Sequence, residues 1–224
     1  MIRIRSFRDG DLDALYDVCL RTGDAGEDAR AMFLDPHLLG HVYAGPYARF
    51  SPATAFVVED GAGIGGYIVG PADTVAFEDA LERDWWPALR LKYADSPAPR
   101  TADERMRRHV HHPRRARPEI AGAFPAHLHV NLLPSLRGQG VGRRLLDVWC
   151  ETVAALGAGG AHLEVGTRNA RAVRFYRANG FREIARAGEV LTLARPIRDS
   201  SRAWTTDRAK VFSFRRRPSS GRAP

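Results

Sequence analysis

The stretch Arg137-Gly138-Gln139-Gly140-Val141-Gly142 decides the fold, because it joins an alternating apolar segment to a strongly amphipathic one. Apolar and polar residues alternate over residues 126–132, which predicts a strand, and apolar residues recur at helical spacing over residues 140–156. A helix N-terminus has unpaired N–H groups and partial positive charge, and glycines let a backbone approach an anion closely. With Arg137 and Arg143 beside it, the stretch predicts a pyrophosphate site.

Other protein classes use similar glycine-rich turns between a strand and a helix. A P-loop requires Gly-Lys followed by Ser or Thr, which this stretch lacks. A dinucleotide-binding fingerprint normally opens the first βαβ unit, whereas this turn follows a predicted β-hairpin, although Glu164 stands roughly where such a fold places its ribose-binding acid. A helix start that uses glycine only for tight packing remains a structural alternative.

A second segment, Asn169-x-x-Ala172-x-x-Phe175-Tyr176-x-x-x-Gly180-Phe181, follows one predicted strand later. Together the two segments resemble the acetyl-CoA-binding half of the GNAT superfamily of N-acetyltransferases, over residues 126–186. The resemblance implies an α/β (α+β) fold in which helices flank a mixed, mostly antiparallel sheet of about seven strands. It also implies that the fourth and fifth strands splay apart and admit the pantetheine arm of acetyl-CoA.

The same resemblance implies contacts with the cofactor, residue by residue. The backbone near Leu132 and Leu133 would pair with the pantetheine arm, and Asn169 and Phe175 would line the CoA side. The residues implied for the pyrophosphate are Arg137, Gly138, Gln139, Gly140, Val141, Gly142 and Arg143. Tyr176 matches the tyrosine that often protonates the departing CoA thiolate. Phe175 is explained equally well as a core aromatic, whereas a buried Tyr176 hydroxyl would require a partner.

The first half of the chain carries a narrower resemblance. Residues 17–26, 40–47 and 85–87 look like bacterial acetyltransferases related to the C-terminal acetyltransferase-like domain of O-GlcNAcase. That resemblance implies an acid on the fourth strand where this chain has Asn131, and members of the group are suspected of having lost catalysis. From the resemblance to the GNAT superfamily we expect transfer of the acetyl group of acetyl-CoA to an amine of a small molecule or protein. The alternative is a non-catalytic acyl-CoA-binding or protein-interaction module on the same fold.

Acetyl transfer to an amine needs a base for the amine and a proton for the leaving thiolate. His129 is the candidate base, with His127 on the same strand face, because imidazole titrates near neutral pH. Surface or packed histidines, and a water-mediated base, fit the pattern as well. Tyr176 is the candidate acid. The candidate acceptor-binding residues are Asp24, Tyr43 and Tyr47, of which Asp24 would attract a cationic amine and the two tyrosines are explained equally well by core packing.

The remaining pattern predicts the rest of the fold. Strands are expected at residues 2–7, 54–59, 64–69, 161–165, 181–186 and 190–195, and helices at 9–22, 75–93 and 169–178. Residues 27–50 look like a short helix followed by an aromatic loop, and residues 94–118 like a basic insertion without regular periodicity. Three histidines in that insertion, His109, His111 and His112, lack supporting carboxylates or thiolates, so we expect no metal site.

Charge and composition limit the other function classes. The formal net charge is +8, but residues 198–224 account for +6 and residues 96–118 for +5, which leaves −3 for the remainder. Such basic segments are more often solvated than binding, which weakens a nucleic-acid-binding hypothesis. We expect one domain at residues 1–197 and a basic, disordered tail at 198–224. Two cysteines in apolar helical patterns and the absence of a secretory pattern predict a cytoplasmic protein. Without a long apolar run, we expect no membrane partner. We expect a monomer or a homodimer.

Overall fold

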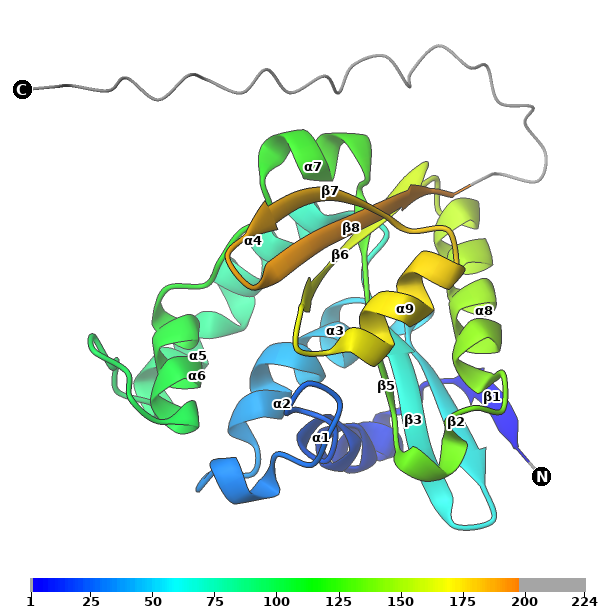
Figure 1. Ribbon diagram of the computed structural model, residues 1–224. Coiled ribbons are helices and arrows are strands. Elements are labelled where there is room, and N and C mark those ends of the chain that lie inside the picture. Colours follow the sequence, from blue (N-terminus) through cyan, green and yellow to red (C-terminus); the bar gives the residue numbers. More distant parts are fainter. Residues whose placement is uncertain (1, 198–224) are drawn as a thin grey trace, which may run out of the picture.

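The computed structural model describes residues 2–197, and the predicted tail lies outside them. Within that range the strands form two four-stranded sheets, ordered β1-β2-β3-β5 and β4-β6-β8-β7 (Figure 1). The strands are β1 (Arg3–Ser6), β2 (Phe56–Asp60), β3 (Gly63–Val69), β4 (Ala126–His127), β5 (His129–Leu132), β6 (Gly160–Gly166), β7 (Arg182–Ala187) and β8 (Val190–Pro196). Every pairing is antiparallel except the parallel pair of β4 and β6.

Residues 126–132 link the two sheets. The first part, β4, pairs with β6 as far as His127 opposite His162, whereas β5 pairs with β3, with Leu132 opposite Gly66. The two sheets therefore diverge after His127, as the splay of the fourth and fifth strands predicts, and this division gives eight strands in the described range rather than about seven. Figure 1 shows β6, β7 and β8 leaning away from β1, β2 and β3.

Helices cover the sheets and fill two cores. They are α1 (Leu12–Leu20), α2 (Leu38–Tyr43), α3 (Gly45–Phe50), α4 (Thr74–Asp84), α5 (Trp86–Lys92), α6 (Ala102–His111), α7 (Pro118–Ala123), α8 (Val141–Ala155) and α9 (Ala170–Ala178). Because side chains alternate along a strand, Val57 and Tyr67 enter the core with α1 to α6, while Val58 and Ile68 enter the core with α8 and α9. Both faces of the first sheet are therefore buried.

Two segments differ from the sequence-based expectation. Residues 40–47 were expected to form a loop, but they belong to α2 and α3. The expected excursion at residues 94–118 contains α6, which begins with a capping box between Thr101 and Glu104. Asp103 is buried and accepts the N–H groups of Leu34 (2.9 Å) and Asp35 (3.0 Å), and Val110 is fully buried. The basic segment is therefore part of the folded body around α2 and α5.

Candidate active site

The glycine-rich stretch forms the entrance to α8, as predicted. A short 3-10 turn, Pro134–Leu136, follows β5, and Gly140 is the N-cap of α8. Gly138 and Gly140 have φ angles of +75° and +73°, a region that side chains with a Cβ rarely adopt. Nothing lies within 4 Å of a Cβ built at either position, so the space beside the turn is open.

The amide groups of this turn are free to bind an anion. From Gly138 to Arg143, no backbone N–H donates to a protein acceptor within residues 2–197. The first turn of a helix leaves such donors unpaired and carries partial positive charge, a combination that suits a phosphate group. The side chain of Arg143 is 73% exposed at the same helix start. These residues therefore fit the pyrophosphate of a CoA thioester.

Arg137 lies differently from the prediction, because its guanidinium is already bound by the protein. Its Nε donates to the Leu132 carbonyl (2.9 Å), its Nη2 donates to the Gly26 carbonyl, and its Nη1 lies 3.4 Å from Glu27. Burial, followed by the charge of Arg171, lowers the pKa of Arg137. The side chain braces the end of β5 against the loop after α1, so in this structure its charge is not free for an anion.

Three other predicted cofactor residues converge at the end of β5. A Cβ at Gly142 would lie 3.2 Å from the Phe175 ring and 3.4 Å from the Leu132 side chain. The glycine at 142 thus allows the loop, β5 and α9 to approach one another. The N–H of Leu133 donates to Gly65 (2.8 Å), so this donor belongs to the first sheet and is not available to a pantetheine arm.

Helix α9 begins at a capped end and carries the candidate acid. Asn169 is its N-cap, and the side-chain oxygen accepts the N–H of Ala172 at 3.0 Å. Tyr176 is buried between the rings of Phe175 and Phe181, with centroid distances of 5.2 and 5.5 Å. Its hydroxyl has no hydrogen-bond partner within residues 2–197, and burial raises its pKa, so it stays protonated at neutral pH.

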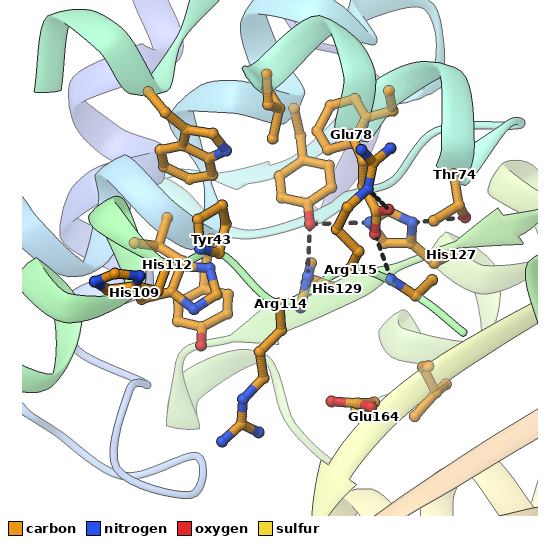
Figure 2. Close-up of a pocket in the computed structure, with 18 of the residues that line it drawn as sticks. Tyr43, Thr74, Glu78, His109, His112, Arg114, Arg115, His127, His129 and Glu164 are labelled. Atoms are coloured by element: carbon orange, nitrogen blue, oxygen red, sulfur yellow. Dashed lines mark hydrogen bonds and ion pairs between the residues drawn. The ribbon is translucent and has the colours of Figure 1, made fainter. Parts of the chain in front are cut away.

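A second region, which we call the acceptor cavity, lies where the two sheets diverge and has a volume of about 690 Å³. Its walls come from α2 to α7, from the segment between α6 and α7, from β4 to β6 and from β8. Tyr43, Tyr47 and His129 line it, so the structure brings these three predicted residues together. Figure 2 shows the histidines, Tyr43 and several charged side chains around this opening.

A chain of hydrogen bonds runs along the wall of the acceptor cavity. The Tyr47 hydroxyl lies 3.0 Å from Nε2 of both His127 and His129. Thr74 Oγ1 lies 2.9 Å from Nδ1 of His127 and donates its own proton to the Pro125 carbonyl at 2.6 Å. The dashed lines at Thr74, His127 and His129 in Figure 2 belong to this network.

The network fixes the protonation of both rings. Because the Thr74 proton is committed to Pro125, Nδ1 of His127 must donate to Thr74, and its Nε2 must accept from Tyr47. The Tyr47 oxygen then accepts Nε2–H of His129. Nδ1 of His129 is left as an unprotonated nitrogen that has no partner within residues 2–197 and is not fully enclosed.

Both rings are neutral at physiological pH. Burial lowers the pKa of His129 to about 4. Burial also lowers the pKa of His127 well below its usual value, and His129 and His162 lower it further. The neutral state required by the hydrogen-bond chain and the effect of burial on the pKa therefore agree.

Asp24 does not join the acceptor cavity, contrary to its predicted role. Its carboxylate lies 3.4 Å from Arg168, and the nearby Glu27 lies 3.2 Å from Arg171 and 3.4 Å from Arg137. The loop after α1 therefore faces the arginines near the cofactor turn. Asp24 and Glu27 each lie next to an arginine, so neither carboxylate is free to attract a cationic amine.

Three residues of the acceptor cavity, Thr74, Arg114 and Glu164, were not among the predicted acceptor-binding residues. Thr74 lies at the start of α4, and only the fold brings it to His127. Arg114 was considered part of the basic insertion. Glu164 was noted only as an acid at some distance after the glycine turn, and in β6 it is an exposed residue between the buried Leu163 and Val165.

The three histidines of the segment predicted to be an insertion, residues 94–118, contact different partners. Nε2 of His111 lies 2.7 Å from the Tyr93 carbonyl, Nε2 of His112 lies 2.9 Å from Asp95, and His109 packs against Trp86. Over residues 2–197, no group of three or more His, Cys, Asp or Glu side chains has an arrangement suited to a metal ion.

Comparison with known proteins agrees with this geometry. An acetyltransferase (GNAT) domain model matches residues 114–183. The crystal structure of SsHAT is similar with a TM-score of 0.83 and 37% sequence identity, covering 88% of this chain and 99% of that chain. The chain therefore belongs to the GNAT acetyltransferase family, whose co-substrate is acetyl-CoA. A complex of Chaetomium thermophilum Naa20 with a bisubstrate analogue shares the fold at a TM-score of 0.50, with 19% identity and coverage of 87% and 86%.

Protein O-GlcNAcase of Rattus norvegicus is 26% identical over 186 residues, which are 82% of this chain and 20% of that protein. The chain thus spans about a fifth of the length of the curated relatives it matches. This match agrees with the narrower resemblance of the first half. Among the described helices, none has the length and apolar character needed to cross a membrane.

Proposed function

We propose that this protein transfers the acetyl group of acetyl-CoA to an amine, with Nδ1 of His129 as the proton acceptor. The observation that carries the proposal is the hydrogen-bond chain through Tyr47, which leaves this nitrogen unprotonated in the acceptor cavity. The free N–H groups from Gly138 to Arg143, at the start of α8, support cofactor binding.

The chemistry needs a weak but well-placed base. Acetyl-CoA supplies an activated acyl group, and the amine nitrogen forms a C–N bond with the acyl carbon as the C–S bond breaks. Attack places positive charge on the nitrogen next to a carbonyl carbon, which makes its proton far more acidic than that of a free ammonium. His129, with a pKa of about 4, accepts that proton. The acceptor must therefore reach His129 as a neutral amine.

Tyr176 supplies the proton for the sulfur. Burial raises the pKa of Tyr176 and keeps its hydroxyl protonated. Within residues 2–197, no protein group accepts a hydrogen bond from this hydroxyl. The Tyr176 proton passes to the departing thiolate, the proton accepted by His129 goes to solvent, and Tyr176 takes one proton back from solvent, so the reaction leaves the protein unchanged. The packing of Tyr176 against Phe175, whose ring lies near Gly142, supports this role.

Asn131 supports the structure and does not argue for the non-catalytic alternative. Its side-chain amide donates to Thr22 Oγ1 at 2.5 Å, and Thr22 donates to the Val18 carbonyl at 2.6 Å. This pair ties β5 to the end of α1. The acid missing from that position is not required as a base, because His129 faces the acceptor cavity from the same strand.

A screen of amine acceptors with acetyl-CoA, followed by detection of free CoA thiol, tests the proposal. His129→Gln is expected to lower kcat by about a hundredfold while acetyl-CoA still binds, as measured by calorimetry. His111→Gln is the matched control, because His111 is bound to the Tyr93 carbonyl and does not line the acceptor cavity. Tyr176→Phe should also lower kcat and retain binding. Binding of acetyl-CoA without turnover of any amine would instead support the non-catalytic module.

A further inference from the structure

The charged side chains of the acceptor cavity are mostly neutralised by one another. Arg115 pairs with Glu78 and Asp79. The other paired side chains are Glu82 with Arg90, Arg117 with Glu119, and Arg108 and His112 with Asp95. Arg105 donates to the Arg100 carbonyl at 3.0 Å. The ion-paired groups therefore contribute little uncompensated charge to the acceptor cavity, and the Arg105 guanidinium is held by a backbone carbonyl.

Two charged side chains of the acceptor cavity have no such partner in the described part of the chain. Within residues 2–197, Arg114 and Glu164 are the arginine and carboxylate side chains of the acceptor cavity that have neither a hydrogen bond nor an ion pair. Both are exposed residues, so solvent or a ligand can reach them. They have opposite charges, yet they do not pair with each other.

The two residues lie on different walls of the acceptor cavity. Arg114 belongs to the segment between α6 and α7, whereas Glu164 is on β6, where the second sheet turns away from β5. Figure 2 shows both side chains extending into the opening below His129. Burial raises the pKa of Tyr43, Arg114 lowers it and Glu164 raises it, so both charges act on the same part of the acceptor cavity.

We propose that the acceptor is a small zwitterion that carries a primary amine and a carboxylate. This inference rests on the proposed function. Glu164 attracts the ammonium group to the acceptor cavity, and Arg114 binds the carboxylate through its planar guanidinium. One free cation and one free anion match a ligand with one charge of each sign, whereas a phosphate dianion would leave an uncompensated negative charge.

The order of events follows from the charges. The ammonium group loses one proton to solvent before attack, and its second proton passes to His129 when the C–N bond forms. The product amide has no positive charge, so it no longer attracts Glu164 while its carboxylate still contacts Arg114. The acetylated compound therefore binds more weakly than the acceptor, which favours product release.

The test compares unbranched ω-amino carboxylates of increasing length with alkylamines of the same carbon count. For the preferred length, kcat/KM for the amino carboxylate should exceed that for the alkylamine by about tenfold or more. Arg114→Gln should remove this preference by raising KM for the amino carboxylate, with little effect on the alkylamine. Arg114→Glu should shift the preference toward a diamine. Arg117→Gln is the matched control, because Arg117 lines the same cavity but pairs with Glu119.

A second measurement does not depend on turnover. Calorimetry with the protein saturated with CoA should show binding of the amino carboxylate, and Arg114→Gln should weaken it by about tenfold. Equal activity on both compound series, or a preference unchanged in Arg114→Gln, would overturn the zwitterion inference while leaving acetyl transfer intact. Turnover of no amine at all, together with normal amino carboxylate binding, would overturn the proposed function and leave the ligand class standing.

Discussion

The hydroxyl oxygen of Tyr47 lies 3.0 Å from Nε2 of His129, and this contact determines which nitrogen of the ring is free. Because Tyr47 donates its own proton to His127, it can only accept from His129. A buried tyrosine thus controls the tautomer of the candidate base without contacting the acceptor nitrogen itself.

Tyr47→Phe should lower kcat by about tenfold, because His129 is no longer held in one tautomer. It should also lower the free energy of unfolding by about 1–3 kcal/mol, because two buried ring nitrogens lose their partner. Steady-state kinetics and urea unfolding measure the two effects. Tyr93→Phe is the control, since Tyr93 is also buried and donates to Asp35 at 2.7 Å outside the acceptor cavity. An equal fall in kcat in the control would assign the effect to stability.

The free energy of unfolding should decrease as pH falls from about 6.5 to 4. The folded pKa values of His109 and His129 are about 4 because of burial, whereas an unfolded histidine titrates near 6.5. The unfolded state therefore binds protons first, and each such histidine contributes a slope of up to about 1.4 kcal/mol per pH unit in this window. Urea unfolding at a series of pH values measures the slope.

His129→Gln should reduce that slope, because it removes one of the buried imidazoles. A slope that does not respond to His129→Gln would contradict the burial of this ring as the cause. The expected stability contribution is fully present above about pH 6.5, which is the sign for a group whose pKa is lowered by folding.

Gly140→Ala should weaken binding of acetyl-CoA by about tenfold or more and cost about 1 kcal/mol of stability. The stability cost arises from the φ of +73°, and the loss of binding from a methyl group beside the free N–H donors. Gly188→Ala is a matched control, because Gly188 has a φ of +57° and open space around it but lies in the turn between β7 and β8. Calorimetry and thermal unfolding should show equal strain in both variants and weaker binding only in Gly140→Ala.

Glu27→Gln should strengthen binding of acetyl-CoA by a factor of about two to five. The Glu27 carboxylate is 66% exposed, and it competes with an incoming phosphate for Arg137 and Arg171. Exposed ion pairs contribute at most about 1 kcal/mol, so the free energy of unfolding should change little. Glu183→Gln, which removes the pair with Arg177 (3.1 Å), is the control. Weaker binding in Glu27→Gln would indicate that the carboxylate orients the arginines for the ligand.

The parts of the fold that follow from local rules could be predicted from the sequence. Alternation identified the β2–β3 hairpin and residues 126–132, and the glycine turn before α8 followed from the need for an open helix start. Helices α2 and α3 could not be predicted in this way, because Gly40 and Gly45 look like loop residues. In the structure a Cβ at either position would collide with Tyr16, so these glycines allow close packing against α1.

Site residues that belong to one strand or one helix motif could be predicted from the sequence. Contacts between residues of different elements could not. Alternation placed His127 and His129 on one strand, and a family motif indicated Tyr176. The Tyr47 bridge joins residues 80 and 82 positions apart, and no local pattern reports such a contact. Likewise Arg137 looked like a free cation, because the loop that binds it comes from 110 residues earlier in the chain.

The segment that links the two sheets has an evolutionary consequence. Residues 126–132 pair with the first half of the chain through β3 and with the second half through β6, so neither half is an interchangeable module. A side chain at Gly66 would collide with Leu132, the residue that Arg137 braces at the end of β5. A recombined protein that takes its first half from a relative must therefore preserve this register, or the turn before α8 will move with the strand.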